Sequence, residues 1–305
     1  MTSDIEHLQI QANGISIHVA VSGPPDAPPI LCLHGFPEGW LLWRSTMREL
    51  SEYRVYAPDL RGYPGSSQPP GGYDALTLTD DIHELITALG LEKPHLLSHD
   101  WGGALAWVFA HRYSSQIRSL MVVNCTHPKT LTRAVLEFQD FQTLRSSYVL
   151  PLQIPRLPEA LFTTPLGRRF MEFACHQLGG RSGRMDMPTL REMLARFQRP
   201  EDMRGPINYY RELVRTQFSS AWRARFDQVY SVPITVPITL IWGRDDFVLS
   251  REVAQQSYRD AGRPVDLRLL PGVGHFVPIE APETLAAEVR RAIQNAANQP
   301  GTFAR

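Results

Sequence analysis

Short apolar segments alternate with helical patterns over most of the chain. Period-two patterns over Leu8–Ala12 and Ile15–Val21 flank Asn13-Gly14, which is typical of a β-hairpin. Six further strands are predicted at 30–33, 54–57, 95–98, 120–124, 238–242 and 265–270. Helical patterns at 76–89, 102–111 and 282–297 separate or follow them. This alternation predicts an α/β fold, with a mostly parallel eight-stranded sheet that carries helices on both faces.

The strand pattern stops after the sixth predicted strand. Residues from about Lys129 to Gln228 are rich in Arg, Phe, Leu and Pro and contain helical pieces at 131–144 and 189–197. We therefore expect a core formed by 1–128 and 229–305, and a helical cap (lid) domain formed by 129–228. Open α/β sheets bind ligands at the carboxyl ends of their strands, so a cap there would shape a pocket. The other interpretation is a separate helical domain with no part in the chemistry.

One strand-to-helix junction has the pattern of a nucleophile elbow. In His95–Ala104 the small residues Ser98 and Gly102 flank Asp100 at the centre. An aspartate at a helix start is also an ordinary N-cap. As a nucleophile, however, a carboxylate attacking an alkyl carbon forms an ester that water can hydrolyse, whereas serine would form a stable ether. Asp100 therefore favours alkylating substrates, either epoxides or alkyl halides.

The remaining catalytic groups follow in the order nucleophile, acid, histidine. Asp246 comes after the seventh strand, with Asp245 as the adjacent alternative, and His275 lies on a glycine-rich loop after the last strand. His275 would act as general base on water, and Asp246 would orient its ring.

The loop His34–Glu38 follows the third strand. We expect an oxyanion hole from the backbone N–H groups of Phe36 and Trp101, and a cis bond before Pro37.

Together these motifs resemble those of α/β-hydrolase-fold epoxide hydrolases of the soluble type, which use an aspartate nucleophile. His34–Glu38, His99–Gly103 and Asp59–Ser67 carry the resemblance, which spans nearly the whole chain. It implies conversion of epoxides to vicinal diols through a covalent alkyl-enzyme intermediate. It also implies two cap tyrosines that donate to the epoxide oxygen. Gly205–Arg211 resembles the segment that carries one of them, which would be Tyr210, with Tyr209 as the neighbouring alternative. Ser146–Gln153 resembles the segment that carries the other, which would be Tyr148.

Other functions use the same fold. A haloalkane dehalogenase would share Asp100, His275 and Trp101, but many such enzymes carry a side-chain halide donor where this chain has Phe36. A fluoroacetate-type dehalogenase would need an arginine beside the nucleophile to bind the substrate carboxylate, and this chain has Trp101 there. Asp100 argues against a serine esterase. A non-catalytic ligand-binding protein on this fold would be expected to have lost part of the triad.

Composition limits the partners. Lys and Arg number 31, as do Asp and Glu, so the neutral chain lacks the overall basic field that binds nucleic acid or anionic membranes. No apolar run reaches the length of a membrane span, and no secretory pattern opens the chain. The sparse cysteines Cys32, Cys125 and Cys175 predict reduced thiols in a cytoplasmic protein.

The predicted partners are a small apolar epoxide and water, with no cofactor and no metal. His34, His99 and His127 show no metal-ligand spacing. The physiological substrate, the selectivity and the oligomeric state, a homodimer included, stay open.

Overall fold

The computed structural model describes residues 5–180 and 185–298. In this part of the chain eight strands form one sheet in the order β1-β2-β4-β3-β5-β6-β7-β8. Their bounds are β1 Glu6–Ala12, β2 Ile15–Ser22, β3 Pro29–Leu33, β4 Arg54–Pro58, β5 His95–His99, β6 Ser119–Val123, β7 Ile238–Gly243 and β8 Asp266–Leu270. The pairs β1–β2 and β2–β4 are antiparallel and the other pairs are parallel. The α/β fold predicted from the sequence is therefore confirmed.

The first two strands form the predicted hairpin. Ala12 pairs with Ile15 across the turn, and Asn13 and Gly14 have φ values of 46° and 72°. Positive φ at both central residues belongs to the turn whose twist matches that of the strands, and Asn-Gly adopts it at little cost.

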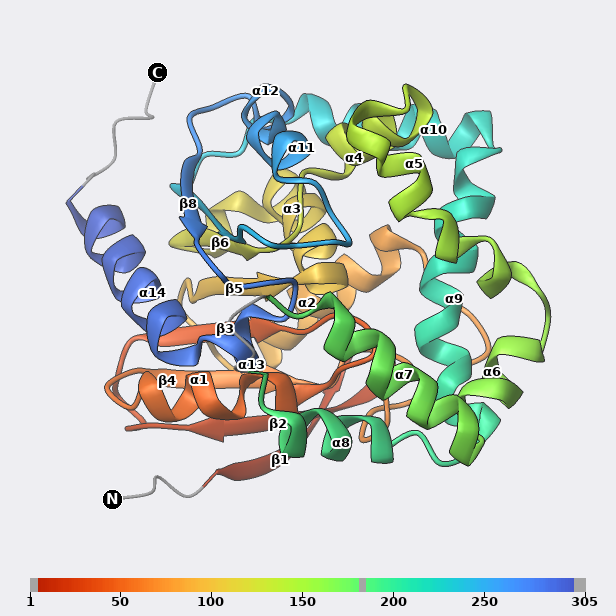
Figure 1. Cartoon of the computed structure of the whole chain (residues 1–305). Coiled ribbons are helices and arrows are strands. Elements are labelled where there is room, and N and C mark those ends of the chain that lie inside the picture. The colour runs from red at the N-terminus through yellow and green to blue at the C-terminus, as the bar shows by residue number, and fades with distance from the viewer. Residues whose placement is uncertain (1–4, 181–184, 299–305) are drawn as a thin grey trace.

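Helices cover the sheet on both faces (Figure 1). On one face lie α1 (Arg44–Glu49), α13 (Val277–Glu280) and α14 (Pro282–Ala297), and on the other α2 (Ala75–Ala88) and α3 (Asp100–Tyr113). The short helices α11 (Arg251–Gln255) and α12 (Ser257–Ala261) connect β7 to β8. Helix α3 is almost wholly buried from Gly102 to His111, as its apolar composition predicts. The core therefore lies between the sheet and these two helical layers.

A helical insertion separates β6 from β7, as predicted. Its helices are α4 Pro128–Leu136, α5 Gln142–Arg145, α6 Leu157–Phe162, α7 Pro165–Leu178, α8 Met187–Ala195, α9 Pro200–Gln217 and α10 Ser220–Ser231. Short 3-10 turns, η3 Gln139–Phe141, η4 Ser147–Val149 and η5 Pro151–Gln153, link α4 to α6. The division into a core and a cap domain stays a prediction, and we use "cap" for residues 129–228. Among the described residues, no helix has the length and apolarity needed to cross a bilayer.

The continuous helix expected over 131–144 does not form. Helix α4 ends at Leu136, and Phe138, Asp140 and Phe141 adopt left-handed backbone with φ of 55°, 45° and 57° before α5 begins. The buried Gln142 side chain donates to the carbonyl of Val248 and accepts from the backbone N–H of Ser250. These long-range hydrogen bonds require the chain to turn toward the β7–α11 loop, so tertiary contacts override the local helical pattern.

The ion pair between Arg196 and Asp59 is one of several that tie the cap to the core. Arg196, at the end of α8, makes two hydrogen bonds of 2.7 and 2.6 Å to the carboxylate of Asp59. Asp59 is fully buried and also accepts from His18 and from the backbone N–H of Trp40. These contacts lower the pKa of its carboxyl against the opposing effect of burial, so the pair stays charged.

Candidate active site

The elbow between β5 and α3 presents Asp100 in strained backbone. Asp100 has φ of 49°, a value that side chains with a Cβ rarely adopt. A Cβ on Gly102 would lie 2.3 Å from the carbonyl oxygen of Leu33, and one on Gly35 would lie 2.3 Å from Asp100 Oδ1. Only glycine fits at both positions. The turn therefore brings the carboxylate of Asp100 against the loop that follows β3.

Two groups contact the carboxylate of Asp100 directly. The backbone N–H of Phe36 donates to Asp100 Oδ1 over 2.9 Å, and His275 Nε2 lies 3.6 Å from Asp100 Oδ2. Trp101 stands in the first turn of α3, where backbone N–H groups have no partner within the helix. The Phe36–Pro37 bond is cis, as expected. Asp100 thus sits at the positive end of α3, where a negative charge is favoured.

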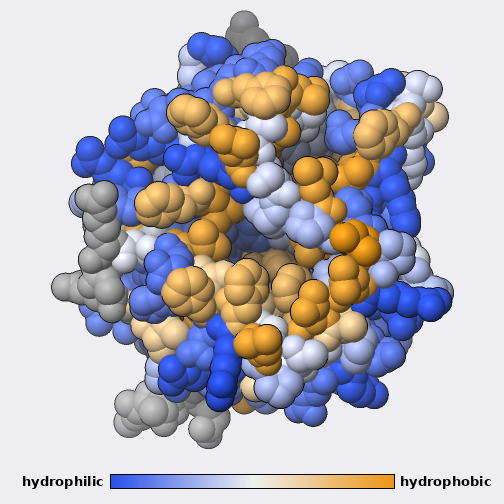
Figure 2. Space-filling view, turned by 45° about the vertical axis from the view of Figure 1, so that its right-hand side comes forward, coloured by the Kyte–Doolittle hydropathy of each residue, from blue (hydrophilic) through white to orange (hydrophobic). Residues whose placement is uncertain are grey.

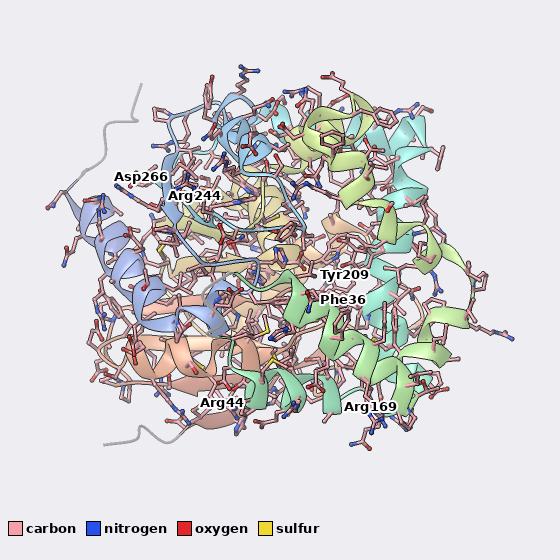
Figure 3. The ribbon with its side chains drawn as sticks, in the orientation of Figure 1. Phe36, Arg44, Arg169, Tyr209, Arg244 and Asp266 are labelled. Atoms are coloured by element: carbon pink, nitrogen blue, oxygen red, sulfur yellow. The ribbon has the colours of Figure 1, made fainter. Side chains whose placement is uncertain are left out.

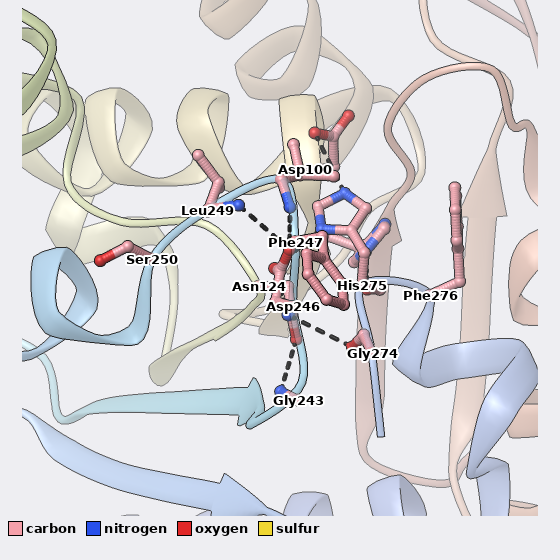
Figure 4. Close-up of polar contacts among 12 residues, drawn as sticks. Asp100, Asn124, Gly243, Asp246, Phe247, Leu249, Ser250, Gly274, His275 and Phe276 are labelled. Atoms are coloured by element: carbon pink, nitrogen blue, oxygen red, sulfur yellow. Dashed lines mark hydrogen bonds and ion pairs between the residues drawn. The ribbon is translucent and has the colours of Figure 1, made fainter. Parts of the chain in front are cut away.

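His275 bridges Asp100 and the third carboxylate (Figure 4). Its Nδ1 lies 2.9 Å from Oδ2 of Asp246, and the contact comes from Asp246 rather than from the adjacent Asp245. Asp246 Oδ1 accepts the backbone N–H groups of Val248 and Leu249, which fixes the carboxylate in the turn. The structure therefore brings Asp100, His275 and Asp246 together in one chain of contacts, from loops that follow β5, β8 and β7.

The charges of Asp100, His275 and Asp246 stabilise one another. Burial acts against the charged form of Asp100, but its contact with His275 outweighs this and lowers the pKa of its carboxyl. Burial also acts against an imidazolium, but the charge of Asp246 and the contact with Asp100 raise the pKa of His275 well above its ordinary value. The resting site accordingly holds a protonated His275 between two carboxylates.

Asn124 belongs to the site, although the sequence analysis did not single it out. It follows β6 with φ of 44°, donates from Nδ2 to Asp246 Oδ2 over 2.6 Å and accepts from the N–H of Gly243 over 2.9 Å. Like Asp100, it is a polar residue directly after a strand of the sheet, and Asp246 lies three residues beyond the end of β7. That shared position at the carboxyl edge of a parallel sheet was the available signal.

A second buried pair supports the same loops. Glu38 Oε2 accepts the N–H of Gly35 over 2.5 Å, and Glu38 Oε1 lies 2.9 Å from His99 Nδ1 in a contact poorly aligned for a hydrogen bond. His99 Nε2 lies 2.9 Å from the carbonyl oxygen of His275. Both side chains are fully buried. The pair therefore links the Phe36 loop to the His275 loop beneath the carboxylate of Asp100.

His34 and His127, the other two histidines considered as metal ligands, also form hydrogen bonds within the protein. His34 Nε2 accepts the N–H of Leu60, and His127 Nδ1 accepts that of Lys129. Within 5–180 and 185–298, no three His, Cys, Asp or Glu side chains form a group that could hold a metal ion.

Tyr210 reaches the site from α9, and Tyr148 lies beside it. The Tyr210 ring makes edge contacts with Phe36 and Trp101, with centroids 5.3 and 5.0 Å apart. Tyr148, in η4, packs against Tyr210 with centroids 5.9 Å apart. The rival Tyr209 instead donates its hydroxyl to the carbonyl of Arg61 over 2.9 Å. Figure 3 shows Tyr209 and Phe36 near the centre of the molecule, where α9 faces the sheet.

Both site tyrosines keep their protons at neutral pH. Burial raises the pKa of Tyr210 and of Tyr148, and the negative charge of Asp100 adds to the effect. Tyr148 is 41% exposed as a whole residue, and its ring packs edge-on against that of Tyr210. The two phenols are therefore hydrogen-bond donors rather than anions.

A buried ion pair in the cap holds the two tyrosine segments together. Arg211 makes a bidentate contact with Glu159, at 2.6 and 3.1 Å, and donates to the carbonyl of Leu152. Gln153 donates to the carbonyl of Tyr210 over 3.4 Å. Because these contacts join α9 to η5 and α6, they fix Tyr210 relative to the segment that carries Tyr148.

The arrangement supports a specific kind of chemistry. A carboxylate faces an imidazolium and one backbone N–H, and two neutral phenols lie on the cap side. Figure 2 shows a hollow on the cap face with apolar side chains around it. An apolar substrate could be attacked by the carboxylate while the phenols stabilise an oxygen that gains negative charge.

Comparison with known proteins places the chain among hydrolases. Residues 28–282 match a family described as having the alpha/beta hydrolase fold. Epoxide hydrolase 4 of Mus musculus is 34% identical over 283 residues, which cover 91% of this chain and 76% of that protein. The AB hydrolase superfamily protein YfhM of Bacillus subtilis is 36% identical over 82% of this chain and 85% of its own. The crystal structure of epoxide hydrolase VrEH1 from Vigna radiata superposes with a TM-score of 0.77 at 26% identity, covering 95% of this chain and 98% of the other.

Proposed function

Since the chain belongs to the α/β-hydrolase-fold family and is related to epoxide hydrolases, we propose that it converts epoxides to vicinal diols through an ester on Asp100. The observation that carries this proposal is the carboxylate at the elbow. It contacts His275, and two neutral tyrosines lie on the cap side of it. A carboxylate nucleophile suits attack on an alkyl carbon, and phenols suit an oxygen that becomes an alkoxide.

The first step is alkylation of the enzyme. An oxygen of the Asp100 carboxylate attacks an epoxide carbon, and the carbon–oxygen bond of the ring breaks. The ring oxygen takes a proton from one of the two tyrosines, Tyr210 or Tyr148, while the other donates a hydrogen bond. The products of this step are an alkyl ester on Asp100, a free hydroxyl on the substrate and a tyrosinate.

Ester formation also changes His275. It removes the negative charge of Asp100, one of the two carboxylates that raise the pKa of the imidazole. His275 can then lose its proton, which restores the tyrosine, and become a neutral base. The charge on Asp246 stays and keeps the ring oriented for the next step.

The second step is hydrolysis of the ester. His275 Nε2 takes a proton from water, whose oxygen attacks the ester carbonyl of Asp100. The backbone N–H groups of Phe36 and Trp101 would stabilise the tetrahedral oxyanion. Its collapse releases the diol and restores the carboxylate of Asp100 and the imidazolium of His275. Water is the other substrate, and the scheme uses no cofactor.

The dehalogenase alternative has weaker support. A halide leaves as an anion and needs no proton, so the two phenols would have no chemical task. Phe36 offers a backbone donor to the site but no side-chain donor. A panel of small apolar epoxides and alkyl halides separates the two reactions, because we expect diol formation and no halide release.

A single-turnover experiment tests the covalent route. With enzyme in excess in heavy-oxygen water, the oxygen added to the substrate should come from Asp100, so the first diol should carry ordinary oxygen. The label should appear on the peptide that contains Asp100. Direct attack by water would instead label the diol in its first turnover and leave the peptide unlabelled, a result that would exclude the ester mechanism.

A further inference from the structure

Glu280 is a buried acidic residue that the steps above do not use. It ends α13, the short helix that follows the His275 loop, and is 3% exposed. A buried carboxylate is costly unless hydrogen-bond donors surround it. Its Oε2 accepts the backbone N–H groups of Gly180 and Gly274 over 2.7 and 2.8 Å, and its Oε1 accepts that of Phe276 over 2.9 Å. One side chain therefore holds three backbone positions.

Two of these N–H groups belong to the residues on either side of His275. Because Gly274 and Phe276 donate to the same carboxylate, a rotation of the His275 backbone between them would break at least one of these hydrogen bonds. Figure 4 shows the loop from Gly274 to Phe276, with the ring of His275 turned toward Asp100. Backbone dihedral angles limit the rotamers that a side chain can adopt. Glu280 therefore helps to set the direction of the imidazole.

The third N–H group belongs to the cap. Gly180 follows α7, and the carbonyl of Leu178, at the end of α7, accepts the backbone N–H of His275 over 3.1 Å. The two segments touch along their backbones, because a Cβ on either Gly180 or Gly274 would overlap main-chain atoms of the other segment. The end of α7 therefore supports the His275 loop directly, and Glu280 bonds to both segments.

We propose that Glu280 is a positioning residue for the second step of the reaction. It holds the His275 loop against the end of α7, so that Nε2 of His275, 3.6 Å from Asp100 Oδ2, faces the ester and the attacking water. Its hydrogen bonds are to backbone groups, so it acts through His275 and not on the substrate. The inference rests on the proposed function, because it assigns Glu280 to hydrolysis of the ester.

The two steps of the reaction depend on His275 differently. Alkylation needs the carboxylate of Asp100 and a donor from the cap tyrosines, whereas hydrolysis needs His275 to take a proton from water at hydrogen-bond distance. A catalytic group displaced by about 1 Å can lose about a hundredfold in rate. Loss of the Glu280 contacts should therefore slow hydrolysis and leave alkylation near the parent rate. A carboxylate that served stability alone would change the folded fraction and neither rate of the folded protein.

The variant Glu280→Gln tests this assignment. An amide offers one acceptor oxygen instead of two and turns an N–H group toward a backbone donor. With a small apolar epoxide, rapid-mixing single-turnover kinetics separates the two steps, and intact-mass measurement detects the ester. We expect hydrolysis to slow about a hundredfold, the ester to accumulate, and kcat and KM to fall together. Unchanged hydrolysis, or equal slowing of both steps, would overturn the proposal.

Two further variants exclude a general loss of structure. Glu280→Asp keeps both carboxylate oxygens on a shorter side chain and should slow hydrolysis less than Glu280→Gln does, and it decides the question if Glu280→Gln does not fold. The matched control is Asp74→Asn. Asp74 also accepts two backbone N–H groups, but at the start of α2, on the opposite face of the sheet from α13. The control should leave both steps at the parent rate, and slower hydrolysis there would contradict a specific role for Glu280.

A measurement without substrate separates failure of this inference from failure of the proposed function. The proton between His275 Nδ1 and Asp246 Oδ2, in a charge-assisted hydrogen bond of 2.9 Å, should give a far-downfield resonance that is absent from His275→Gln. In Glu280→Gln this resonance should broaden through faster exchange with water, whereas Asp74→Asn should keep it sharp. A parent that opens no epoxide but shows this broadening would refute the proposed function and leave the positioning of His275 by Glu280 intact. An inactive parent with an unchanged resonance in Glu280→Gln would refute both.

Discussion

Asn124 donates its side-chain amide to Asp246 Oδ2 over 2.6 Å, the same oxygen that accepts from His275 Nδ1. Two donors therefore converge on one carboxylate oxygen, while the other oxygen accepts two backbone N–H groups. With these four donors the carboxylate of the buried Asp246 is held in one orientation. Asn124 acts on the imidazole through Asp246, as a positioning residue.

The variant Asn124→Asp tests this role. It keeps an oxygen for the N–H of Gly243 and a residue type that tolerates left-handed backbone, but it places a second carboxylate against Asp246. Two adjacent carboxylates cannot both ionise easily, so we expect kcat to fall about a hundredfold, as for a misplaced catalytic group. The acidic limb of the pH–rate profile should move to higher pH. Unchanged kcat and an unchanged profile would rule out the positioning role.

His275→Gln should trap the ester. Attack by Asp100 does not require a base, but hydrolysis of the ester does, so the variant should accumulate an adduct of the substrate's mass. Intact-mass measurement after incubation with an epoxide detects it. Asp100→Ala is the control and should form no adduct. Normal turnover by His275→Gln, or an adduct in Asp100→Ala, would contradict the assigned roles.

Tyr210→Phe and Tyr148→Phe should each slow alkylation, because each removes a donor for the developing alkoxide. Loss of one oxyanion donor typically costs about a hundredfold in rate, and the double variant should be slower than either single variant. Tyr209→Phe is the matched control, since its hydroxyl bonds the carbonyl of Arg61 instead. Rapid-mixing single-turnover kinetics measures the step. Equal slowing by Tyr209→Phe would mean that cap packing, and not donation, is responsible.

Buried neutral histidines should make stability fall in mild acid. Burial lowers the pKa of His95 from 6.5 to about 4, with the charge of Arg118 adding to the effect. Above pH 6.5 the imidazole is neutral in both states, whereas between pH 6.5 and 4 only the unfolded chain binds the proton. The unfolding free energy should therefore drop by about 3 kcal/mol across that window from this group alone.

Urea unfolding of the parent and of His95→Gln at several pH values isolates this contribution. The variant loses the hydrogen bond to Ser119 and should be less stable near neutral pH. Its stability should, however, depend less steeply on pH. Parallel curves for the two proteins would show that His95 does not titrate as its burial predicts.

Local patterns determined much of the fold. The hairpin at Asn13-Gly14, the strands of the sheet and the helix at 282–297 follow from side-chain periodicity and turn chemistry, which act between neighbours in the chain. The order of Asp100, Asp246 and His275 along the chain also pointed to the candidate site. Each of these residues follows a strand, and the carboxyl ends of parallel strands share one edge.

Tertiary structure alone decided the rest. The helix expected over 131–144 breaks because Gln142 bonds the distant Val248–Ser250 loop, and no local pattern reports such a contact. The choice between Tyr209 and Tyr210 depends on which neighbouring side chain faces the core, and the role of Asn124 depends on a partner 122 residues away. Periodicity determines which elements form and which faces are apolar. Hydrogen bonds between loops depend on how those elements pack, so they become visible only in the folded chain.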